Sequence, residues 1–228
     1  MIGWIEFAAA MGLFLISHRL PAMLGVKGWL ESRLGRWGYT AVFSVLSLGL
    51  LWWLILAAGR PPFVPLWDQQ GWHRWAVNVV MPVAGVLAVF GVAAPNPFAF
   101  EGRAAGFDPD RPGIAGVTRQ PLLWALALWA GVHLLPNGDL AHVLLFAPML
   151  VFSLLGMGIV ERRRRRVMGA ETWARMTART DLVPFRALVA GRWRPAAGPS
   201  LMRLAIWALT WAALWYLHEP VVGVWPGV

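Results

Sequence analysis

The chain has 228 residues, of which 58% are hydrophobic and only 14% are charged. A soluble domain of this length cannot bury so much apolar surface, so most of the chain must be solvated by lipid. The net charge of +9 does not indicate nucleic-acid binding, because the basic residues are confined to a few gaps between apolar segments. The absence of cysteine excludes disulfides, thiolate ligands and thiol nucleophiles.

Six apolar segments follow one another along the chain, and the gaps between them hold most of the Pro, Gly and charged residues. A bilayer core about 30 Å thick requires roughly 20 residues of helix, in which every backbone group is paired internally. The sequence therefore predicts a single domain, residues 1–228, folded as an all-α, polytopic membrane helix bundle with about six transmembrane helices. The predicted spans are Ile2–Ser17, Gly38–Ala58, Trp75–Ala94, Pro121–Leu135, Leu140–Val160 and Leu201–Leu217.

Basic residues are unevenly distributed between the gaps, which predicts the orientation of the bundle. Eighteen of the twenty Lys and Arg residues fall in the first, third and fifth gaps and at their edges, eleven of them within Glu161–Arg203. Because Lys and Arg are enriched on the cytoplasmic side, both the N- and C-termini are expected to be periplasmic. Residues 161–200 are expected to form a basic cytoplasmic loop, whose Arg162–Arg166 run lies on anionic lipid headgroups. No nucleic-acid partner is expected, since no nucleic-acid-binding fold is recognisable.

Two local patterns refine this topology. Pro136-Asn137-Gly138-Asp139 is typical of a tight turn, so the fourth and fifth spans are expected to form an antiparallel hairpin. Within the basic loop, residues 171–180 predict a short helix on the membrane surface, with Trp173 and Met176 toward the lipid.

Five histidines are the main candidates for chemistry, because an ionisable side chain within a membrane is costly and is usually functional. His73 and His218 fall at the ends of predicted spans, where an interfacial position accounts for them. His142 begins the fifth span and can cap the hairpin turn. His18 lies at the inner end of the first span, where it can extend to the headgroups.

His133 is the strongest of the five candidates. It lies about 18 Å along its predicted helix from Pro121, at 1.5 Å per residue, so it cannot easily reach cytoplasmic water. The small residues before it would let either a neighbouring helix or a macrocycle approach the backbone. Trp124 and Trp129 on the same helix either pack in the bundle or line a flat cofactor. A neutral imidazole in apolar surroundings, with no competing thiolate, is a suitable ligand for haem iron.

Several motifs resemble those of the NnrU family, which includes the plant-type ζ-carotene isomerase. In the first half of the chain, the resemblance is carried by Ser17-His18-Arg19-Leu20-Pro21-Ala22, Gly35-Arg36-Trp37-Gly38-Tyr39 and Phe43-Ser44-Val45-Leu46-Ser47-Leu48. In the second half, it is carried by Thr118-Arg119-Gln120-Pro121, Leu128 to His133, Asn137-Gly138, Gly169-Ala170-Glu171-Thr172-Trp173, Thr180-Asp181-Leu182-Val183-Pro184-Phe185 and Gly191-Arg192. Together these motifs cover most of the chain.

The resemblance implies a multi-pass protein of the bacterial inner membrane that binds haem b. It implies His18 and His133 as axial ligands of the haem iron. It further implies a link to denitrification and nitric oxide metabolism, or a haem-dependent isomerase-like activity. The isomerase has a cysteine ligand three residues before its histidine, and Ala130 stands at that position here. Ligand switching through a thiolate is therefore excluded, and carotenoid isomerisation is less expected.

Depth in the membrane opposes the implied pairing of His18 with His133. With periplasmic termini, His18 lies near the inner end of its helix and His133 in the outer half of its own, about 10–15 Å apart along the membrane normal. His133 and His142, in contrast, flank the hairpin turn at similar depth, although His142 matches no motif of the family.

Part of the sequence also resembles membrane methyltransferases that use S-adenosylmethionine. The matching residues are Arg119-Gln120-Pro121, Glu161-Arg162, Gly169 and Trp173. Under this alternative, Arg119 and Glu161 would hold the cofactor at the cytoplasmic face, although Gln120 replaces a histidine of those enzymes. A third alternative is a non-enzymatic membrane partner of nitrogen-oxide reductases. The sequence identifies neither a substrate nor a catalytic residue.

Overall fold

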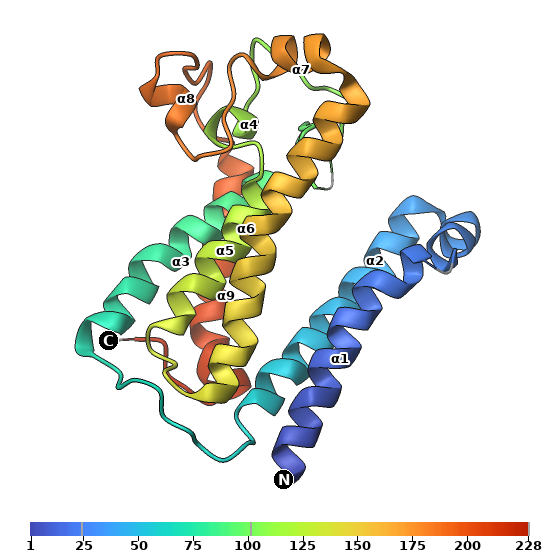
Figure 1. The fold of residues 1–228 in the computed structure, drawn as a ribbon. Helices are drawn as coiled ribbons and strands as arrows, with labels where there is room; N and C mark the ends of the chain where they lie inside the picture. Colours follow the sequence, from blue (N-terminus) through green and yellow to red (C-terminus); the bar gives the residue numbers. More distant parts are fainter. Residues whose placement is uncertain (24, 101, 228) are drawn as a thin grey trace. The chain divides into compact units, whose positions relative to one another are not determined.

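The computed structural model describes residues 1–23, 25–100 and 102–227, apart from the side chains of residues 19–23 and 36. Within this part of the chain every regular element is a helix, and strand-like pairing occurs only at isolated bridges. Each predicted apolar segment is helical over most of its length, although α2 begins earlier and α6 ends later than predicted, so the all-α prediction is confirmed. The helices (Figure 1) are α1 (Ile2–Met23), α2 (Val26–Ala58), α3 (Gly71–Gly91), α4 (Ile114–Val117), α5 (Pro121–Leu134), α6 (Leu140–Met168), α7 (Ala170–Thr177), α8 (Arg186–Val189) and α9 (Leu201–Val222).

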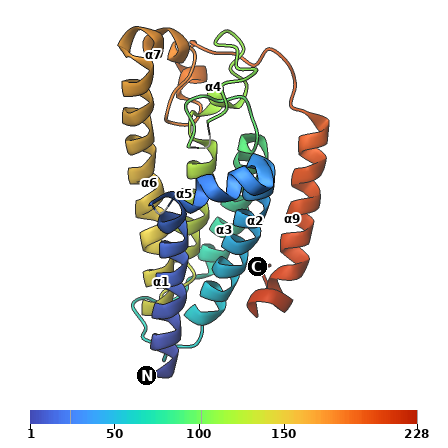
Figure 2. The ribbon, with the colours of Figure 1, turned by 90° about the vertical axis from the view of Figure 1, so that its right-hand side faces the viewer.

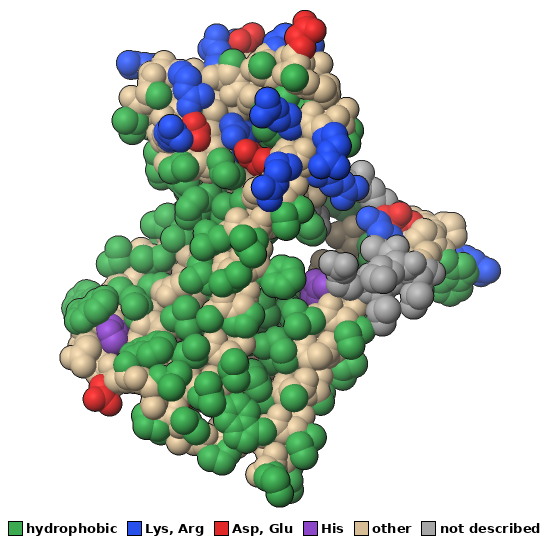
Figure 3. All heavy atoms as spheres, in the orientation of Figure 1, with side chains coloured by type: hydrophobic (Ala, Val, Ile, Leu, Met, Phe, Trp, Pro, Cys, Tyr) green, Lys and Arg blue, Asp and Glu red, His purple; other side chains and the backbone are tan. Residues whose placement is uncertain are grey.

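Three helical stretches are long and apolar enough to cross a membrane, namely Trp37–Ala58, Gly71–Gly91 and Leu140–Met168. Two others, Ile2–His18 and Pro121–Leu134, are apolar but shorter. Hydrophobic side chains also cover most of the outer surface of the long helices, as the space-filling view shows (Figure 3). A surface of this kind requires lipid rather than water, so the chain is a helical membrane protein.

The helices fall into two compact units. The first unit comprises Met1–Asp68 and Asn137–Leu145, and the second comprises Gln69–Pro136 and Phe146–Val228. The first unit therefore contains α1, α2 and the beginning of α6. The second contains the remaining helices and the rest of α6.

In the first unit, the beginning of α1 is fastened to the end of α2. The carboxylate of Glu6 accepts a hydrogen bond from Trp53 Nε1 at 3.1 Å and forms an ion pair with Arg60. A carboxylate on an apolar helix needs such partners, because an isolated charge in lipid is costly. Gly3 allows the two backbones to approach, since a Cβ there would overlap the carbonyl of Arg60.

The structure corrects the predicted loop over Arg19–Trp37. Helix α2 begins at Val26 and breaks only at Gly35, where φ is 70° and ψ is 167°. Glycine adopts this positive φ at no steric cost, so the break falls where the sequence permits it. The helix before the break is polar, with an ion pair of 3.9 Å between Lys27 and Glu31 one turn apart. A polar helix has no apolar run, which is why hydropathy alone misses it.

The predicted turn before α6 is present, and the loop after α2 pairs with it. The backbone N–H groups of Leu66 and Trp67 both donate to the carbonyl of Gly138, at 2.7 and 3.1 Å. Gly138 has no room for a side chain, because a Cβ would overlap Trp67. The glycine is therefore required for this close approach of two backbones.

In the second unit, α3 packs against both α5 and α9. Pro121 opens α5, where its missing N–H costs no hydrogen bond, and lies against Gly91 at the end of α3. Arg203, in the first turn of α9, donates to the carbonyls of Val89 and Val92 at the same end of α3. Helices α5 and α9 therefore both begin beside the end of α3 and run antiparallel to it.

Helices α5 and α6 form the predicted antiparallel hairpin. Near the turn, the rings of Trp129 and Phe146 meet edge to face, with centroids 5.3 Å apart. Farther along, Gly131 lies opposite Leu150, and Leu123 lies opposite Gly156. The small residues predicted to permit close approach therefore do so between these two helices.

The segments 92–120 and 161–200 fold together at one end of the second unit, and we call them the cap. The cap contains α4, α7 and α8, beside the end of α3 and the beginnings of α5 and α9 (Figures 1 and 2). Basic side chains gather over it (Figure 3). Within residues 161–200, α6 continues to Met168, and α7 matches the short helix predicted over residues 171–180.

Candidate functional site

His133 lies near the end of α5, half-buried among aromatic rings of the second unit. Its imidazole centroid is 5.8 Å from that of Trp129 and 5.3 Å from that of Phe146. Its Nδ1 atom is 2.8 Å from the carbonyl oxygen of Trp129, one turn earlier. Trp129 thus helps to fix the imidazole both through its ring and through its backbone.

This hydrogen bond determines which tautomer His133 adopts when neutral. A carbonyl oxygen can only accept, so Nδ1 must carry the proton and the lone pair is on Nε2. Histidines that bind metals are commonly oriented in this way, with one ring nitrogen donating to a backbone carbonyl and the other facing the metal. The hydrogen bond to the Trp129 carbonyl therefore orients the His133 ring on α5.

His18 has the same local arrangement in the first unit. Its Nδ1 is 2.7 Å from the carbonyl oxygen of Phe14, one turn earlier on α1. Its ring lies 4.5 Å from the ring of Phe14 and 5.4 Å from that of Phe43 on α2. The side chain is exposed, which agrees with a position at the edge of the helix pair. Because His18 and His133 belong to separate units, their pairing stays a prediction.

Two other histidines lie in the first turns of helices. Asp139 accepts from the backbone N–H of His142 at 3.3 Å and lies 2.6 Å from its Nδ1, so Asp139 caps α6 and the His142 ring pairs with that cap. His73 is buried in the first turn of α3, where its Nδ1 accepts from the backbone N–H of Gln70 at 3.1 Å. His73 therefore carries its proton on Nε2 when neutral, unlike His18 and His133.

His218 on α9 has a setting that the sequence does not reveal. It is half-buried, and its Nδ1 lies 2.6 Å from the carbonyl oxygen of Val224, which again leaves the lone pair on Nε2. It lies in the same unit as His133. The two residues are distant in sequence, and only the packing of α5 and α9 on α3 places them in one unit.

The histidines of the described helices do not belong to a cluster of metal ligands. Among the described residues there is no group of three or more His, Asp or Glu side chains that could hold a metal ion. Haem supplies the equatorial ligands itself and needs only axial imidazoles. Ala130, at the position of the isomerase's cysteine, is fully buried, so the helix packing leaves no space for a larger ligand there.

The second predicted pair, Arg119 and Glu161, meets in the cap. The guanidinium forms a two-pronged ion pair with the carboxylate, with Nη2 at 3.0 Å from Oε2. Its Nη1 donates to Thr180 at 3.3 Å, and its flat face lies 5.6 Å from the ring of Trp173. The pair joins the residues before α5 to α6, and each side chain is more than four-fifths buried.

A network of buried polar side chains holds the loops around this ion pair. The amide of Gln120 donates to the carbonyl of Phe98 at 2.8 Å and accepts from the N–H of Phe100 at 3.2 Å. Thr118 donates to the carbonyl of Leu182 at 2.7 Å. Gln120 and Thr118 are both almost completely inaccessible, so these bonds replace water that cannot enter.

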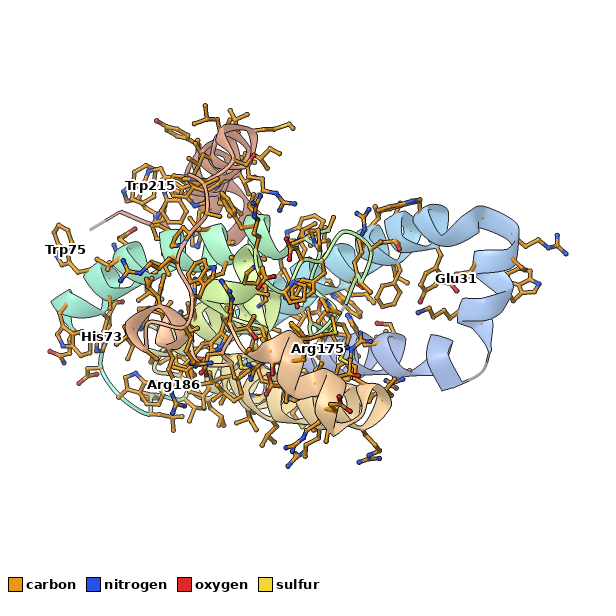
Figure 4. All side chains as sticks on the ribbon, turned by 90° about the horizontal axis from the view of Figure 1, so that it is seen from above. Glu31, His73, Trp75, Arg175, Arg186 and Trp215 are labelled. Atoms are coloured by element: carbon orange, nitrogen blue, oxygen red, sulfur yellow. The ribbon has the colours of Figure 1, made fainter. Side chains whose placement is uncertain are left out.

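Asp181 is the main acidic centre of the cap surface. It forms an ion pair with Arg192 and lies 4.0 Å from Arg186, whose side chain projects from α8 as labelled in Figure 4. Burial raises the pKa of Asp181, but hydrogen bonds from Arg192 and the N–H of Val183, together with the charges of Arg119 and Arg186, hold it below its ordinary value.

These contacts bear on the methyltransferase alternative. Arg119 and Glu161 do converge, but they satisfy one another and are covered by Thr180 and Trp173. Trp173 faces the cap interior, with its ring 5.5 Å from that of Phe98, so the prediction that it faces lipid is wrong. The ion pair therefore holds the cap together.

The cap was not identified as a unit by sequence reasoning, although its segments carry most of the motifs noted above. Residues 118–121, 169–173, 180–185 and 191–192 lie far apart in the chain and meet there through long-range hydrogen bonds. Motif spacing gives no measure of such contacts.

These apolar helices and the basic polar cap define a helical membrane protein. The family model described as NnrU protein matches residues 6–226, so the chain belongs to the NnrU family. The resemblance noted from the motifs is thereby confirmed over nearly the whole chain. Comparisons with curated proteins and with solved structures found no match.

Proposed function

We propose that this NnrU protein binds haem b within the membrane, with His133 as an axial ligand. The main support is the setting of His133: its Nδ1 donates to the Trp129 carbonyl, and its ring lies among the aromatic rings of Trp129 and Phe146. Neutral imidazole is the ligand that b-type haem prefers, and the chain has no thiolate to compete. The family resemblance implies His18 for the other axial position, and His18 has the same tautomer.

The proposed role is in nitrogen-oxide metabolism, as the resemblance implies. When bound, haem would supply an iron that transfers electrons or binds a small diatomic molecule. The protein's contribution would be to orient the imidazole, exclude water and provide apolar access from the bilayer. An isomerase-like activity and a partnership with nitrogen-oxide reductases remain alternatives within the same haem assignment.

The proposed setting is the bacterial inner membrane, with six spans and both termini in the periplasm. The charge asymmetry along the chain supports this orientation, and the cap would then face the cytoplasm. The exposed arginines that follow the apolar part of α6 would lie at the level of anionic headgroups.

The decisive experiment is a visible absorption spectrum of the protein purified in detergent after expression with ample haem. Wild-type protein should show a Soret band, and His133→Ala should lose it or shift it strongly, because the proposed ligand is gone. His142→Ala is the matched control, since it removes a half-buried imidazole near the same turn and should leave the spectrum unchanged. A wild-type protein without a Soret band would refute the haem assignment, while the membrane fraction would report insertion independently.

Methyltransferase activity is the less supported alternative, because Arg119 and Glu161 are occupied with each other. Thermal unfolding with saturating S-adenosylmethionine would detect a binding site, since a ligand that binds only the folded state raises its stability. An unchanged unfolding temperature would remove this alternative.

A further inference from the structure

Helix α6 carries a band of exposed apolar side chains that ends in arginines. Val151, Leu155 and Ile159 are each more than half exposed, and they are four residues apart, so they form one band along the helix. The same helical spacing leads next to Arg162 and then to Arg166, which are also exposed. A surface that contacts lipid chains therefore continues directly into two guanidinium groups.

A shallow hollow lies where α6 ends and α7 begins (Figure 1). Its lining consists of Arg162, Arg165, Arg166, Gly169 and Ala170, and we call it the arginine hollow. The turn between the two helices is made at Gly169, whose φ of 79° suits glycine. This turn brings the last arginines of α6 beside the start of α7.

The three arginines of the hollow differ from other arginines of the cap in having no acidic partner. Arg119 is paired with Glu161, and Arg164 donates to the carbonyl of Ala99 at 3.1 Å. In the part of the chain that the structure describes, no carboxylate forms an ion pair with the three arginines of the hollow. Glu171 lies in the first turn of α7 but is exposed and does not line the hollow. Three neighbouring positive charges repel one another, so an anion that enters the hollow is stabilised.

We infer that the arginine hollow binds the phosphate headgroup of an anionic phospholipid, whose acyl chains lie along the apolar band of α6. Guanidinium groups bind phosphate through paired hydrogen bonds, and the band supplies the apolar surface that a free phosphate would not need. Three guanidinium groups carry more charge than one phosphodiester neutralises. Diphosphatidylglycerol, with two phosphates, should therefore bind more tightly than phosphatidylglycerol, with one.

This inference deepens the proposed membrane setting, in which the arginines lie at the level of the headgroups. It adds a defined site to a general attraction between charges. It does not depend on haem, and binding in detergent does not depend on the orientation of the chain. A protein that purifies without a Soret band would leave the lipid site standing, and loss of the lipid site would leave the haem assignment standing.

The test is lipid binding by the full chain in detergent, followed through the rise in unfolding temperature as lipid is titrated. Diphosphatidylglycerol should protect wild-type protein, whereas phosphatidylcholine, which has no net charge, should not. The double variant Arg162→Gln/Arg166→Gln should weaken binding of diphosphatidylglycerol about tenfold or more. Because both side chains are exposed, the variant should unfold at the wild-type temperature when no lipid is added.

The matched control is the double variant Arg163→Gln/Arg175→Gln. It removes the same number of charges from exposed positions of α6 and α7 that do not line the hollow, and Arg175 is labelled in Figure 4. This control should bind diphosphatidylglycerol as wild-type protein does. Pyrophosphate, which offers two phosphates without acyl chains, should protect the wild type much less than the lipid at equal concentration.

Three results would overturn the inference. Equal weakening in the two double variants would mean that the lipid responds only to net charge. Equal protection of the wild type by phosphatidylcholine and diphosphatidylglycerol would exclude a site for anionic headgroups. Protection by pyrophosphate that matches protection by the lipid would exclude the apolar band and make free phosphate the ligand.

Discussion

Asp181 is a single residue through which several parts of the cap are joined. It bonds to Arg192 and to the N–H of Val183, and the backbone carbonyl of the same residue accepts from the N–H of Arg119 at 2.9 Å. The neighbouring positive charges outweigh the effect of burial, so the pKa of this carboxyl is lower than in the unfolded chain. Its ionised form therefore stabilises the folded cap.

The pH dependence of this stabilisation can be predicted with its sign. Because the folded pKa of Asp181 is depressed, its contribution is fully present above the unfolded value of about 4 and is lost as pH falls through the lower folded value. Asp181→Asn should lower the unfolding temperature by a constant amount in buffers between about pH 5 and pH 7. The difference from wild type should shrink below about pH 4.

A suitable comparison is Asp110→Asn, because Asp110 is mostly exposed and pairs with Arg179 at 3.2 Å. This variant should change the unfolding temperature little at any pH, since exposed ion pairs contribute little. An Asp181→Asn variant whose deficit stays the same at low pH would contradict the assignment.

The helices illustrate which features are predictable from sequence. The six apolar helices and the turn at Gly138 follow from apolar runs and from local turn residues, which are properties of neighbouring positions. The polar helix before Gly35 and the cap do not follow, because they depend on charge pairs and on contacts between distant segments. His133 is recognisable as a candidate from depth alone, whereas the setting of His218 depends on how α9 packs.

The Arg119–Glu161 pair links α6 to the residues that precede α5, so its loss should loosen the hairpin and the cap together. Breaking a buried pair leaves one charge uncompensated and costs on the order of 3 kcal/mol. Arg119→Gln and Glu161→Gln should each lower the unfolding temperature substantially in detergent. The double variant should cost less than the sum of the two, because it leaves no unpaired charge.

Arg179→Gln is the matched control for this element, since it breaks an exposed ion pair in the same cap. It should cost less than about 1 kcal/mol. If Arg119→Gln and Arg179→Gln lower the unfolding temperature equally, burial of the Arg119–Glu161 pair does not contribute to stability. If the decrease in stability of the double variant equals the sum of the decreases for Arg119→Gln and Glu161→Gln, these two side chains do not act as a pair.

At the scale of the whole molecule, charge and apolar surface are segregated. Basic side chains gather over the cap, and hydrophobic side chains cover the long helices (Figure 3). Eighteen of the twenty Lys and Arg residues lie in the first, third and fifth gaps or at their edges. An inverted topology would therefore place nearly all of them in the periplasm, where Lys and Arg are disfavoured.

This distribution predicts the location of reporters fused to the chain. A reporter fused after Val228 should be exported, whereas one fused after Arg166 should remain cytoplasmic. Paired reporters, one active only in the periplasm and one only in the cytoplasm, would measure this for each fusion site. Cytoplasmic activity at both sites would show that α9 does not cross the membrane between them.

The shortness of α5 has a consequence for the bilayer around it. Its 14 residues extend only about 21 Å, whereas a typical hydrocarbon core is about 30 Å thick. Under the proposed six-span topology, irregular backbone from the cap would enter below the headgroup level, which lipid tolerates only when protein covers it. The buried amides and hydroxyl of Asn96, Gln120 and Thr118 provide that cover by satisfying the backbone internally. The proposed topology would thus favour a locally thinner membrane beside α5, and lipid chain length becomes a variable that should affect the protein's stability.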